Sequence, residues 1–409
     1  MTKHVVFLAP DVFPVYREYV RGLKEVGARV TGIGQASRQL LDPQLKGFLD
    51  GYVQVKSLLQ AEPVKEAVGK VHAAHAVDQV ETADEALVLV AAEARERVGI
   101  PGLSAHTARL CRDKPAMKQA LREAGIPCAA FIGSSSLDEL RQFAEREGFP
   151  LVVKPRAALG AMGTYRVESM AELERAAREL GIEGGASVAV EEFVEGHEGF
   201  YDTLAVGGEV VHEFISHYYP SVLTAMRDRR ISPQIAATNR VDGRSYNELK
   251  ELGRKVIQVL GIGTSATHME WFFGPKGLKF SEIGARPPGE RIWDLYCTGN
   301  DMDLYREWAM IVIHGCAGSY PSRRFATGSV QVRPDREGRI AGHDGLHDVL
   351  QQCRPWITRF HVAPVGAATV PLAKGYLCNT WFRLHHPDYD QLRHLMDFIG
   401  SRLKVRAVA

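Results

Sequence analysis

Apolar residues near the start of the chain change from a continuous run to a helical period and back. Val5–Leu8 is a short apolar run that predicts a buried strand, and apolar side chains at helical spacing over residues 14–26 predict a helix that ends before Gly27. Ala28–Ile33 predicts a second buried strand. Strand, helix and strand in this order predict a right-handed, doubly wound α/β unit.

Turn signals place the end of this unit about a hundred residues into the chain. His75–Val80 predicts a further strand and Ala83–Val98 a helix, which the segment Gly99-Ile100-Pro101-Gly102 closes. We therefore expect a first domain over residues 1–105.

Helices and strands alternate in the next part of the chain. The predicted helices are Ala105–Ala124, Leu137–Glu147, Met170–Leu180 and Tyr246–Leu260, with another near residues 303–314. The predicted strands are Leu151–Lys154, Ser187–Phe193, Gly199–Val206, Glu209–Ile215, 268–273 and 278–283. Residues 216–244 are irregular and rich in Tyr, Arg and Pro, so we expect a long functional loop there. After residue 320 strand patterns dominate and a last helix covers Tyr389–Leu403, which we interpret as a smaller third unit over residues 321–409.

Length and charge narrow the class of protein. A chain of 409 residues is too long for one compact core, and 45% hydrophobic with 24% charged residues is ordinary for a globular protein. The net charge of +1 gives no electrostatic argument for nucleic acid or an acidic membrane as partner, and no apolar stretch approaches the roughly 20 residues of a membrane span. The six cysteines are scattered without a CxxC pair and the N-terminal apolar run is too short for a signal peptide, so we expect reduced thiols in a cytoplasmic protein.

Candidate phosphate-binding groups stand at the end of one predicted strand and in the loop after it. Lys154 ends a Val-rich strand and is held by the proline that follows, so its ammonium can meet phosphate oxygens as a point charge. Gly160, Gly163 and Thr164 follow, and small residues let backbone N–H groups close over phosphates. Lys114 is a second candidate cation. Taken alone, either lysine is more typical of a solvated surface, and a Gly pair is typical of a plain hairpin turn.

A short strand that runs into a turn provides a candidate for adenine recognition. In Glu191–Val194, the carbonyl of Glu192 and the N–H of Val194 can read the edge of an adenine. Glu198 stands one turn further on, where a carboxylate can accept both ribose hydroxyls. The alternative is an edge strand that carries solvated glutamates.

Two acidic strands follow. Glu270 and Glu282 come close together if residues 268–273 and 278–283 pair as a hairpin across the Gly-Pro-Lys-Gly turn. Carboxylate oxygens suit Mg²⁺. Apolar neighbours imply that the other face of this hairpin is core, which leaves the two glutamates facing either a cleft or solvent. Just beyond them, Arg286 suits the forked recognition of a carboxylate or phosphoryl group.

The order of these motifs resembles the ATP-grasp superfamily, and within it the carboxylate–amine ligases, which include bacterial L-amino acid ligases and carnosine synthase. No GxxxxGK[ST] phosphate loop or complete dinucleotide fingerprint competes with this reading. The resemblance covers nearly the whole chain. It implies an α/β protein with a Rossmann-like pre-ATP-grasp domain (residues 1–105), an ATP-grasp domain (106–320) whose lid subdomain at about 115–195 clamps ATP, and a C-terminal α+β domain (321–409).

The resemblance also implies roles for the ATP-binding residues. Lys114 and Lys154 resemble the two phosphate-binding lysines, and the segment from Gly160 through Gly163 to Thr164 resembles the flexible glycine loop. The hinge that reads adenine corresponds to Glu191, Glu192, Phe193 and Val194, with Glu198 as the ribose-binding acid.

The catalytic roles follow in the same way. Glu270 and Glu282 resemble the ligands of two magnesium ions, and Arg286 resembles the catalytic arginine of the usual Glu-x-Asn-x-Arg run, with Lys154 as the other expected catalytic residue.

The sequence departs from the usual pattern at two positions. Gly284 stands where many members have a metal-binding Asn, which leaves open how a second magnesium is held. Glu290 stands where a second glycine often follows Gly289, and we expect it to tune specificity. The expected substrate residues are His268, Arg286, Gly289, Glu290 and Arg227.

These resemblances imply a two-step ligation. A carboxylate takes the γ-phosphate of ATP to give an acyl phosphate and ADP, and an amine then displaces phosphate to form an amide. The expected partners are a small carboxylate and a small amine, one of them an amino acid, in a homodimeric enzyme. Glu290 and His268 are candidates for the base. Two alternatives remain open, namely a bicarbonate-activating ATP-grasp carboxylase and a non-catalytic ATP-binding regulatory protein.

Overall fold

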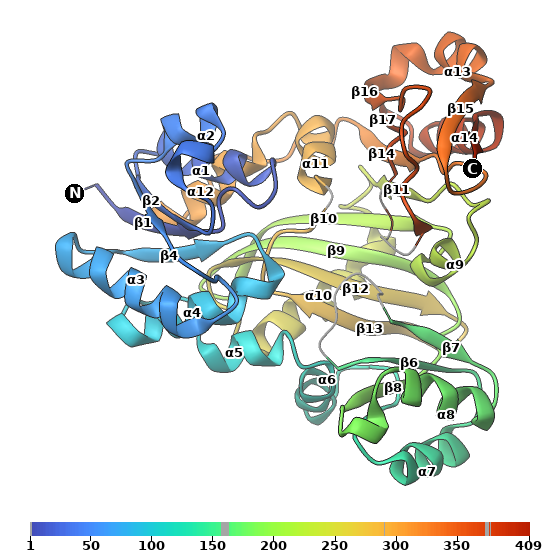
Figure 1. The fold of residues 1–409 in the computed structure, drawn as a ribbon, viewed down its shortest axis with the longest axis horizontal. Helices are drawn as coiled ribbons and strands as arrows, with labels where there is room; N and C mark the ends of the chain where they lie inside the picture. The colour runs from blue at the N-terminus through green and yellow to red at the C-terminus, as the bar shows by residue number, and fades with distance from the viewer. Residues whose placement is uncertain (1, 157–162, 290, 373–375, 377) are drawn as a thin grey trace.

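The computed structural model describes residues 2–156, 163–289, 291–372, 376 and 378–409. Figure 1 shows four regions: an N-terminal α/β unit, a long central sheet, a small lobe below it, and a C-terminal region at the opposite end from the N-terminus. The α/β class predicted from the sequence is confirmed.

The N-terminal unit is a parallel sheet in the order β3-β2-β1-β4 with helices around it. Its strands are β1 (His4–Leu8), β2 (Arg29–Gly34), β3 (Gly51–Gln54) and β4 (Gln79–Thr82), and its helices are α1 (Tyr16–Glu25), α2 (Pro43–Phe48), α3 (Ala61–Ala74) and α4 (Val88–Val98). The predicted strand at residues 75–80 is wrong in its start, because residues 75–78 form the connection after α3 and Asp78 accepts a hydrogen bond from the backbone of His4. The elements between β2 and β4 were not predicted.

The single helix predicted for residues 105–124 is two helices, α5 (Ala105–Leu110) and α6 (Lys114–Glu123). Ser104 caps the first helix through the backbone N–H of Thr107. Asp113 caps the second by accepting a hydrogen bond from the N–H of Ala116. A capping Asp followed by a proline in the first turn is a helix start, so the break lies immediately before Lys114.

The small lobe is an antiparallel sheet in the order β5-β8-β6-β7. Its strands are β5 (Phe131–Ser134), β6 (Leu151–Pro155), β7 (Tyr165–Val167) and β8 (Val188–Glu192), and its helices are α7 (Leu137–Glu147) and α8 (Met170–Glu179). Both helices cover the same face of the sheet (Figure 1). The opposite face is left toward the central sheet.

The central sheet has eight antiparallel strands in the order β13-β12-β9-β10-β11-β14-β17-β16. Its strands are β9 (His197–Val206), β10 (Glu209–Tyr219), β11 (Gln234–Ala237), β12 (Ser265–Gly274), β13 (Gly277–Gly284), β14 (Ala326–Gln331), β16 (Ile357–His361) and β17 (Trp381–His386). Both predicted hairpins, β9–β10 and β12–β13, are confirmed. The helix predicted for residues 246–260 is present as α10 (Asn247–Val259), and it covers part of this sheet.

The segment predicted as an irregular loop, residues 216–244, is largely ordered. β10 continues to Tyr219, α9 (Val222–Arg227) follows, and β11 pairs with both β10 and β14. Ala225 in α9 is fully buried, and its carbonyl accepts a hydrogen bond from Arg333 of the C-terminal region. Most of the arginines that suggested a binding loop form ion pairs with acidic side chains instead.

The C-terminal region is joined to the central sheet, because β14, β17 and β16 are its last three strands. Its remaining elements are β15 (Arg339–Asp344), α13 (Leu346–Cys353), α14 (Tyr389–Arg402) and β18 (Lys404–Val408). Between the two parts lie α11 (Ile292–Asn300), which was not predicted, and α12 (Leu304–His314), which was. α12 packs against α1, and its Trp308 meets Phe7 and Tyr19 in one core shared with the N-terminal unit.

The six cysteines all lie in the described residues and are free thiols. Among the helices that the structure describes, none is long and apolar enough to cross a membrane.

Candidate active site

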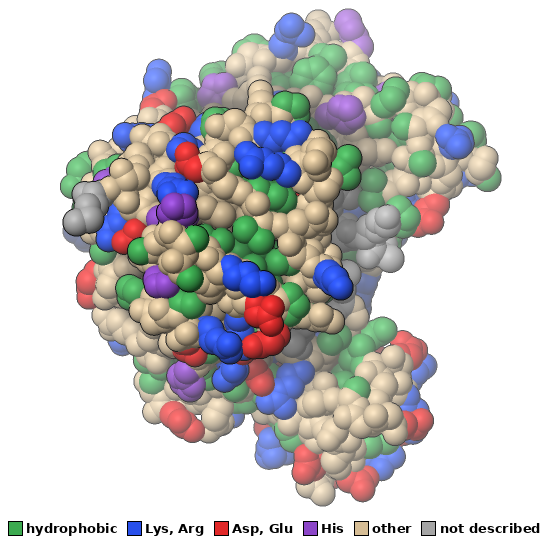
Figure 2. Space-filling view, turned by 60° about the vertical axis from the view of Figure 1, so that its left-hand side comes forward, with side chains coloured by type: hydrophobic (Ala, Val, Ile, Leu, Met, Phe, Trp, Pro, Cys, Tyr) green, Lys and Arg blue, Asp and Glu red, His purple; other side chains and the backbone are tan. Residues whose placement is uncertain are grey.

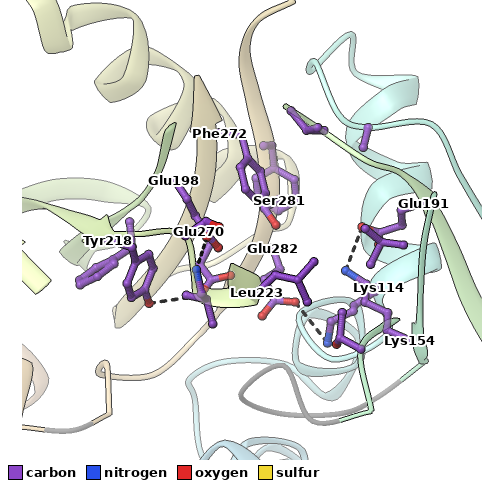
Figure 3. A pocket seen from close by; sticks show the side chains of 18 of the residues that line it. Lys114, Lys154, Glu191, Glu198, Tyr218, Leu223, Glu270, Phe272, Ser281 and Glu282 are labelled. Carbon is purple, nitrogen blue, oxygen red and sulfur yellow. Dashed lines mark hydrogen bonds and ion pairs between the residues drawn. The ribbon is translucent and has the colours of Figure 1, made fainter. Parts of the chain in front are cut away.

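A cavity of about 470 Å³ lies between the lid-like small lobe and the central sheet. Strand alternation explains which side chains face it. On β12, His268 and Glu270 line the cavity, whereas Met269 and Trp271 are buried in the core behind. Figure 2 shows the hollow on one side of the molecule, above the lower lobe, and Figure 3 shows the side chains that meet inside.

Two lysines share one carboxylate on the lobe side of the cavity. Lys154 on β6 and Lys118 on α6 lie 2.9 and 2.7 Å from Glu191 Oε2. Burial alone would raise the pKa of Glu191, but the two ammonium groups lower it to about 2. Burial lowers the pKa of Lys118, whereas for Lys154 the charges of Glu191 and Glu282 outweigh burial and raise the pKa. All three groups line the cavity.

The predicted metal ligands are paired across the hairpin as expected. Glu270 on β12 is directly opposite Glu282 on β13, and both line the cavity. Lys114 Nζ lies 3.3 Å from Glu282 Oε2. Desolvation raises the pKa of Glu282, but Lys114 and Lys154 outweigh it and lower the pKa. The structure therefore brings the predicted cations and the predicted metal ligands together.

The imidazole of His268 is held from behind by a buried acid. His268 Nδ1 lies 2.7 Å from Asp202 Oδ1, and the other oxygen of Asp202 accepts a hydrogen bond of 2.6 Å from Tyr296. Burial disfavours the charged ring, yet Asp202 outweighs it and raises the pKa of His268 to about 9. The second ring nitrogen lies 3.8 Å from Glu270 Oε1, so His268 stands beside the candidate metal ligand.

The predicted hinge leaves the small sheet where β8 ends at Glu192. Phe193 and Val194 line the cavity, and the Phe193 ring lies under the guanidinium of Arg166. The Glu192 side chain pairs with Lys276 at the turn of the β12–β13 hairpin. The hinge thus connects the lobe to the strands that carry the two glutamates.

Glu198 lies at the start of β9, next to this hinge, and lines the cavity. Its Oε2 accepts a hydrogen bond of 2.7 Å from the backbone N–H of Val222, the first residue of α9. Burial and the charge of Glu270 raise its pKa to about 8.

Other predicted residues are placed differently or lie outside the described part of the chain. Gly160, with most of the glycine loop, and Glu290 lie outside the described residues. Thr164 and Gly289 line the cavity, and Gly163 has a positive φ of 67°. Arg227 does not appear among the described lining residues, and its guanidinium donates to the carbonyl of Arg166 in the lobe.

Arg286 lines the cavity beside the glutamate pair. Its Nε donates a hydrogen bond of 2.6 Å to Glu85 Oε2, and a second nitrogen donates to the carbonyl of Pro287. Burial opposes the charge, but Glu85 holds the pKa of Arg286 above its usual value. Glu85 belongs to the N-terminal unit, so this unit reaches the wall of the site.

Four features of the site were not found from the sequence. Lys118 lies one helical turn after Lys114, so both lysines are on one face of α6. This spacing could have identified Lys118 as a residue of the site. No sequence signal indicated Glu85 or Asp202. The apolar end of the cavity was also missed; it is lined by Phe200, Tyr218, Ile235, Ile292 and Tyr376.

The donor set fits a magnesium site that is completed by phosphate and water. Glu270 and Glu282 offer carboxylate oxygens from adjacent strands, the ligand type that Mg²⁺ prefers. No group of three or more His, Cys, Asp or Glu side chains suited to a metal occurs in the described ranges. Mg²⁺ is commonly bound through one or two carboxylates together with substrate phosphates and water.

Comparison with known proteins agrees with this geometry. Residues 119–297 match the family model of the ATP-grasp domain. The chain is 29% identical over 218 residues to an L-arginine-specific L-amino acid ligase of Bacillus subtilis, covering 52% of each protein. It is 27% identical over 231 residues to an alanine–anticapsin ligase of Bacillus subtilis, covering 51% of this chain and 48% of that one. The chain spans about half the length of these curated relatives.

A solved structure extends the likeness to the whole fold. An L-amino acid ligase from Bacillus licheniformis superposes with a TM-score of 0.78 at 18% identity, covering 100% of this chain and 99% of that one. The matched family model includes Lys154, both hairpin glutamates and Arg286. Residues 119–297 are therefore identified as an ATP-grasp domain, and the chain as a whole shares the fold of the solved ligase.

Proposed function

We propose that this protein is an ATP-dependent ligase that joins a carboxylate to an amine through an acyl phosphate, releasing ADP and phosphate. The observation that carries the proposal is the convergence of three kinds of group on one cavity. Lys114 and Lys154 supply cations, Glu270 and Glu282 supply metal-type carboxylates, and Arg286 supplies a forked donor beside them. Catalysis of phosphoryl transfer rests mainly on positioning and on stabilising the developing charge, which these groups can supply.

The position of ATP follows from the chemistry of the lining. Adenine fits the apolar hinge side at Phe193, Val194 and Phe272, and Glu198 stands beside it for the ribose. From there the phosphates extend toward Lys154 and Lys114, which lie near the glutamate pair.

We assign Glu270 and Glu282 to two magnesium ions, with ATP phosphates and water as the remaining ligands. When bound, the magnesium ions would neutralise charge on the phosphates during transfer. Lys114 and Lys154 would hold phosphate oxygens as point charges. Arg286 would hold the substrate carboxylate toward the γ-phosphate and then steady the oxyanion as the amine attacks.

His268 is better suited to hold charge than to remove a proton. In the protein without bound magnesium, Asp202 raises the pKa of His268 to about 9, which favours the charged ring. A cationic ring at this position can attract the carboxylate of the substrate instead. We therefore assign His268 to substrate binding.

An amino acid as one substrate is supported by the names of the relatives, which are amino acid ligases. The test is phosphate release from Mg-ATP across single and paired amino acids, with and without bicarbonate, read together with the mass of any amide formed. Release that needs a pair and yields an amide supports the proposal. Release that needs only bicarbonate contradicts it and favours a carboxylase, and ATP binding without any release favours a regulatory protein. We also propose a homodimer, which light scattering of the purified protein tests.

A further inference from the structure

Glu85 and Gly284 form one arrangement with Arg286 where the N-terminal unit meets the central sheet. Glu85 lies in the short turn of helix after β4, and its Oε2 accepts the hydrogen bond of 2.6 Å from Arg286 Nε. Its backbone carbonyl is held as well, by a hydrogen bond of 2.5 Å from Arg112. The side chains of Glu85 and Arg286 are only 13% and 19% exposed, so the pair is largely shielded from water.

Gly284 lies directly beneath this pair, at the end of β13. A Cβ at residue 284 would lie 2.7 Å from Glu85 Oε2 and 3.5 Å from Arg286 Nε. Its φ is outside the left-handed region, so the obstacle to a side chain at residue 284 is the Glu85 carboxylate and not the backbone conformation. Any side chain at residue 284 would displace the carboxylate of Glu85.

We propose that Glu85 is the positioning residue of Arg286, and that residue 284 is glycine because this carboxylate from the N-terminal unit occupies the space above it. The inference rests on the proposed ligase function, since it concerns the arginine that would hold the reacting carboxylate. Glu85 fixes Nε and so sets the direction in which the remaining guanidinium nitrogens face the cavity. The N-terminal unit thereby takes part in substrate positioning through Arg286.

The first test compares Glu85→Gln, which keeps the size and one acceptor oxygen, with the control Glu93→Gln. Glu93 is also in the N-terminal unit, and it pairs with Arg109 at 2.9 Å away from the cavity. We expect Glu85→Gln to lower kcat/KM for the carboxylate substrate by about ten- to a hundredfold, with an ATP affinity equal to that of Glu93→Gln. In a protein that already carries Arg286→Lys, adding Glu85→Gln should lower kcat/KM by less than a further twofold. The proposal would be overturned if Glu85→Gln had the same kcat/KM as Glu93→Gln. It would also be overturned if Glu85→Gln lowered kcat/KM by the same factor with and without Arg286→Lys.

The second test does not depend on catalysis. Gly284→Asn should lower Tm because its side chain meets the Glu85 carboxylate, and adding Glu85→Ala should restore most of the loss. If Glu85→Ala does not restore Tm, the claim that the Glu85 carboxylate occupies the space next to residue 284 is contradicted. If the wild-type protein makes no amide with any substrate pair, the proposed function fails, and this thermal test still decides whether Glu85 and Gly284 are coupled.

Discussion

Lys114 Nζ lies 3.3 Å from Glu282 Oε2, so a predicted phosphate-binding cation and a predicted metal ligand form one ion pair across the cavity (Figure 3). Lys114 begins α6 and Glu282 lies on β13, and they are far apart in the sequence. The same two charges suit a phosphate and its magnesium ion, because the lysine would turn to the phosphate and the glutamate to the metal. Binding of Mg-ATP would thus replace the Lys114–Glu282 ion pair with two others, one between the lysine and a phosphate and one between the glutamate and magnesium.

Glu270→Gln should nearly abolish magnesium-dependent turnover. The change removes one negative oxygen from the carboxylate pair and leaves the hairpin intact. We expect phosphate release at saturating ATP to fall by about 10²- to 10³-fold, comparable to the loss of one preorganised electrostatic group. The measurement is phosphate release over a magnesium titration, with Glu209→Gln at an exposed position of β10 as control. Turnover within threefold of the control would show that Glu270 is not needed.

Lys118→Met should destabilise the protein. The Lys118 side chain is 1% exposed and its ammonium pairs with Glu191, so its loss leaves that buried carboxylate paired with Lys154. Removing one partner of a buried pair costs about 3–5 kcal/mol of the free energy of unfolding. Urea denaturation measures it, with the exposed Arg97→Met as control. Adding Glu191→Gln should recover part of the loss, and a double variant as unstable as the sum of the two would contradict the pairing.

Glu198→Ala should abolish discrimination between ATP and 2′,3′-dideoxy-ATP. Because its raised pKa of about 8 keeps the Glu198 carboxyl largely neutral at pH 7, each hydrogen bond to a ribose hydroxyl contributes about 0.5–1.5 kcal/mol, and wild type should bind ATP about five- to a hundredfold more tightly than the dideoxy nucleotide. Nucleotide titration of both proteins measures this ratio. A variant that keeps the wild-type preference would remove Glu198 from the ribose site and leave it the structural role of holding Val222.

Glu307 makes stability fall in acid. Burial would raise its pKa, but hydrogen bonds from His212, Gly318 and Ser319 lower it to about 2. A carboxyl whose pKa is lower in the folded state contributes stability that is present above about pH 4.5 and is lost as pH falls toward 2. The full contribution is about 3 kcal/mol.

We therefore expect Glu307→Gln to have a lower free energy of unfolding than wild type at pH 7. The difference between the two proteins should become smaller below about pH 5. Urea denaturation at pH 7, 5 and 4 measures it, with the exposed Glu251→Gln as control. A gap that stays constant over this range would show that the pKa of Glu307 is not lowered by folding.

The sequence predicts most of the site because its groups lie at fixed places on regular strands. Period-two alternation puts His268 and Glu270 on one face, and a four-residue turn brings Glu282 opposite Glu270. Lys154 follows from the end of its strand in the same way. These relations are local, so they can be read along one hairpin or one strand.

What the sequence did not predict depends on contacts between distant segments. Glu85 reaches Arg286 across 201 residues, and no local pattern near Glu85 indicates that contact. α9 forms because Ala225 packs into a core shared with remote strands, whereas its neighbouring arginines suggested a loop. The split between α5 and α6 could have been predicted from the Asp113 cap and the proline after Lys114.

The most direct test of an acyl phosphate follows oxygen from the substrate carboxylate. An amino acid pair that supports amide formation is supplied with ¹⁸O in the carboxylate that becomes the amide, and the released phosphate is examined by mass spectrometry. The account predicts one ¹⁸O atom in each phosphate, because the carboxylate oxygen that attacks the γ-phosphate leaves with it. Unlabelled phosphate, or label found in AMP, would contradict the proposed mechanism.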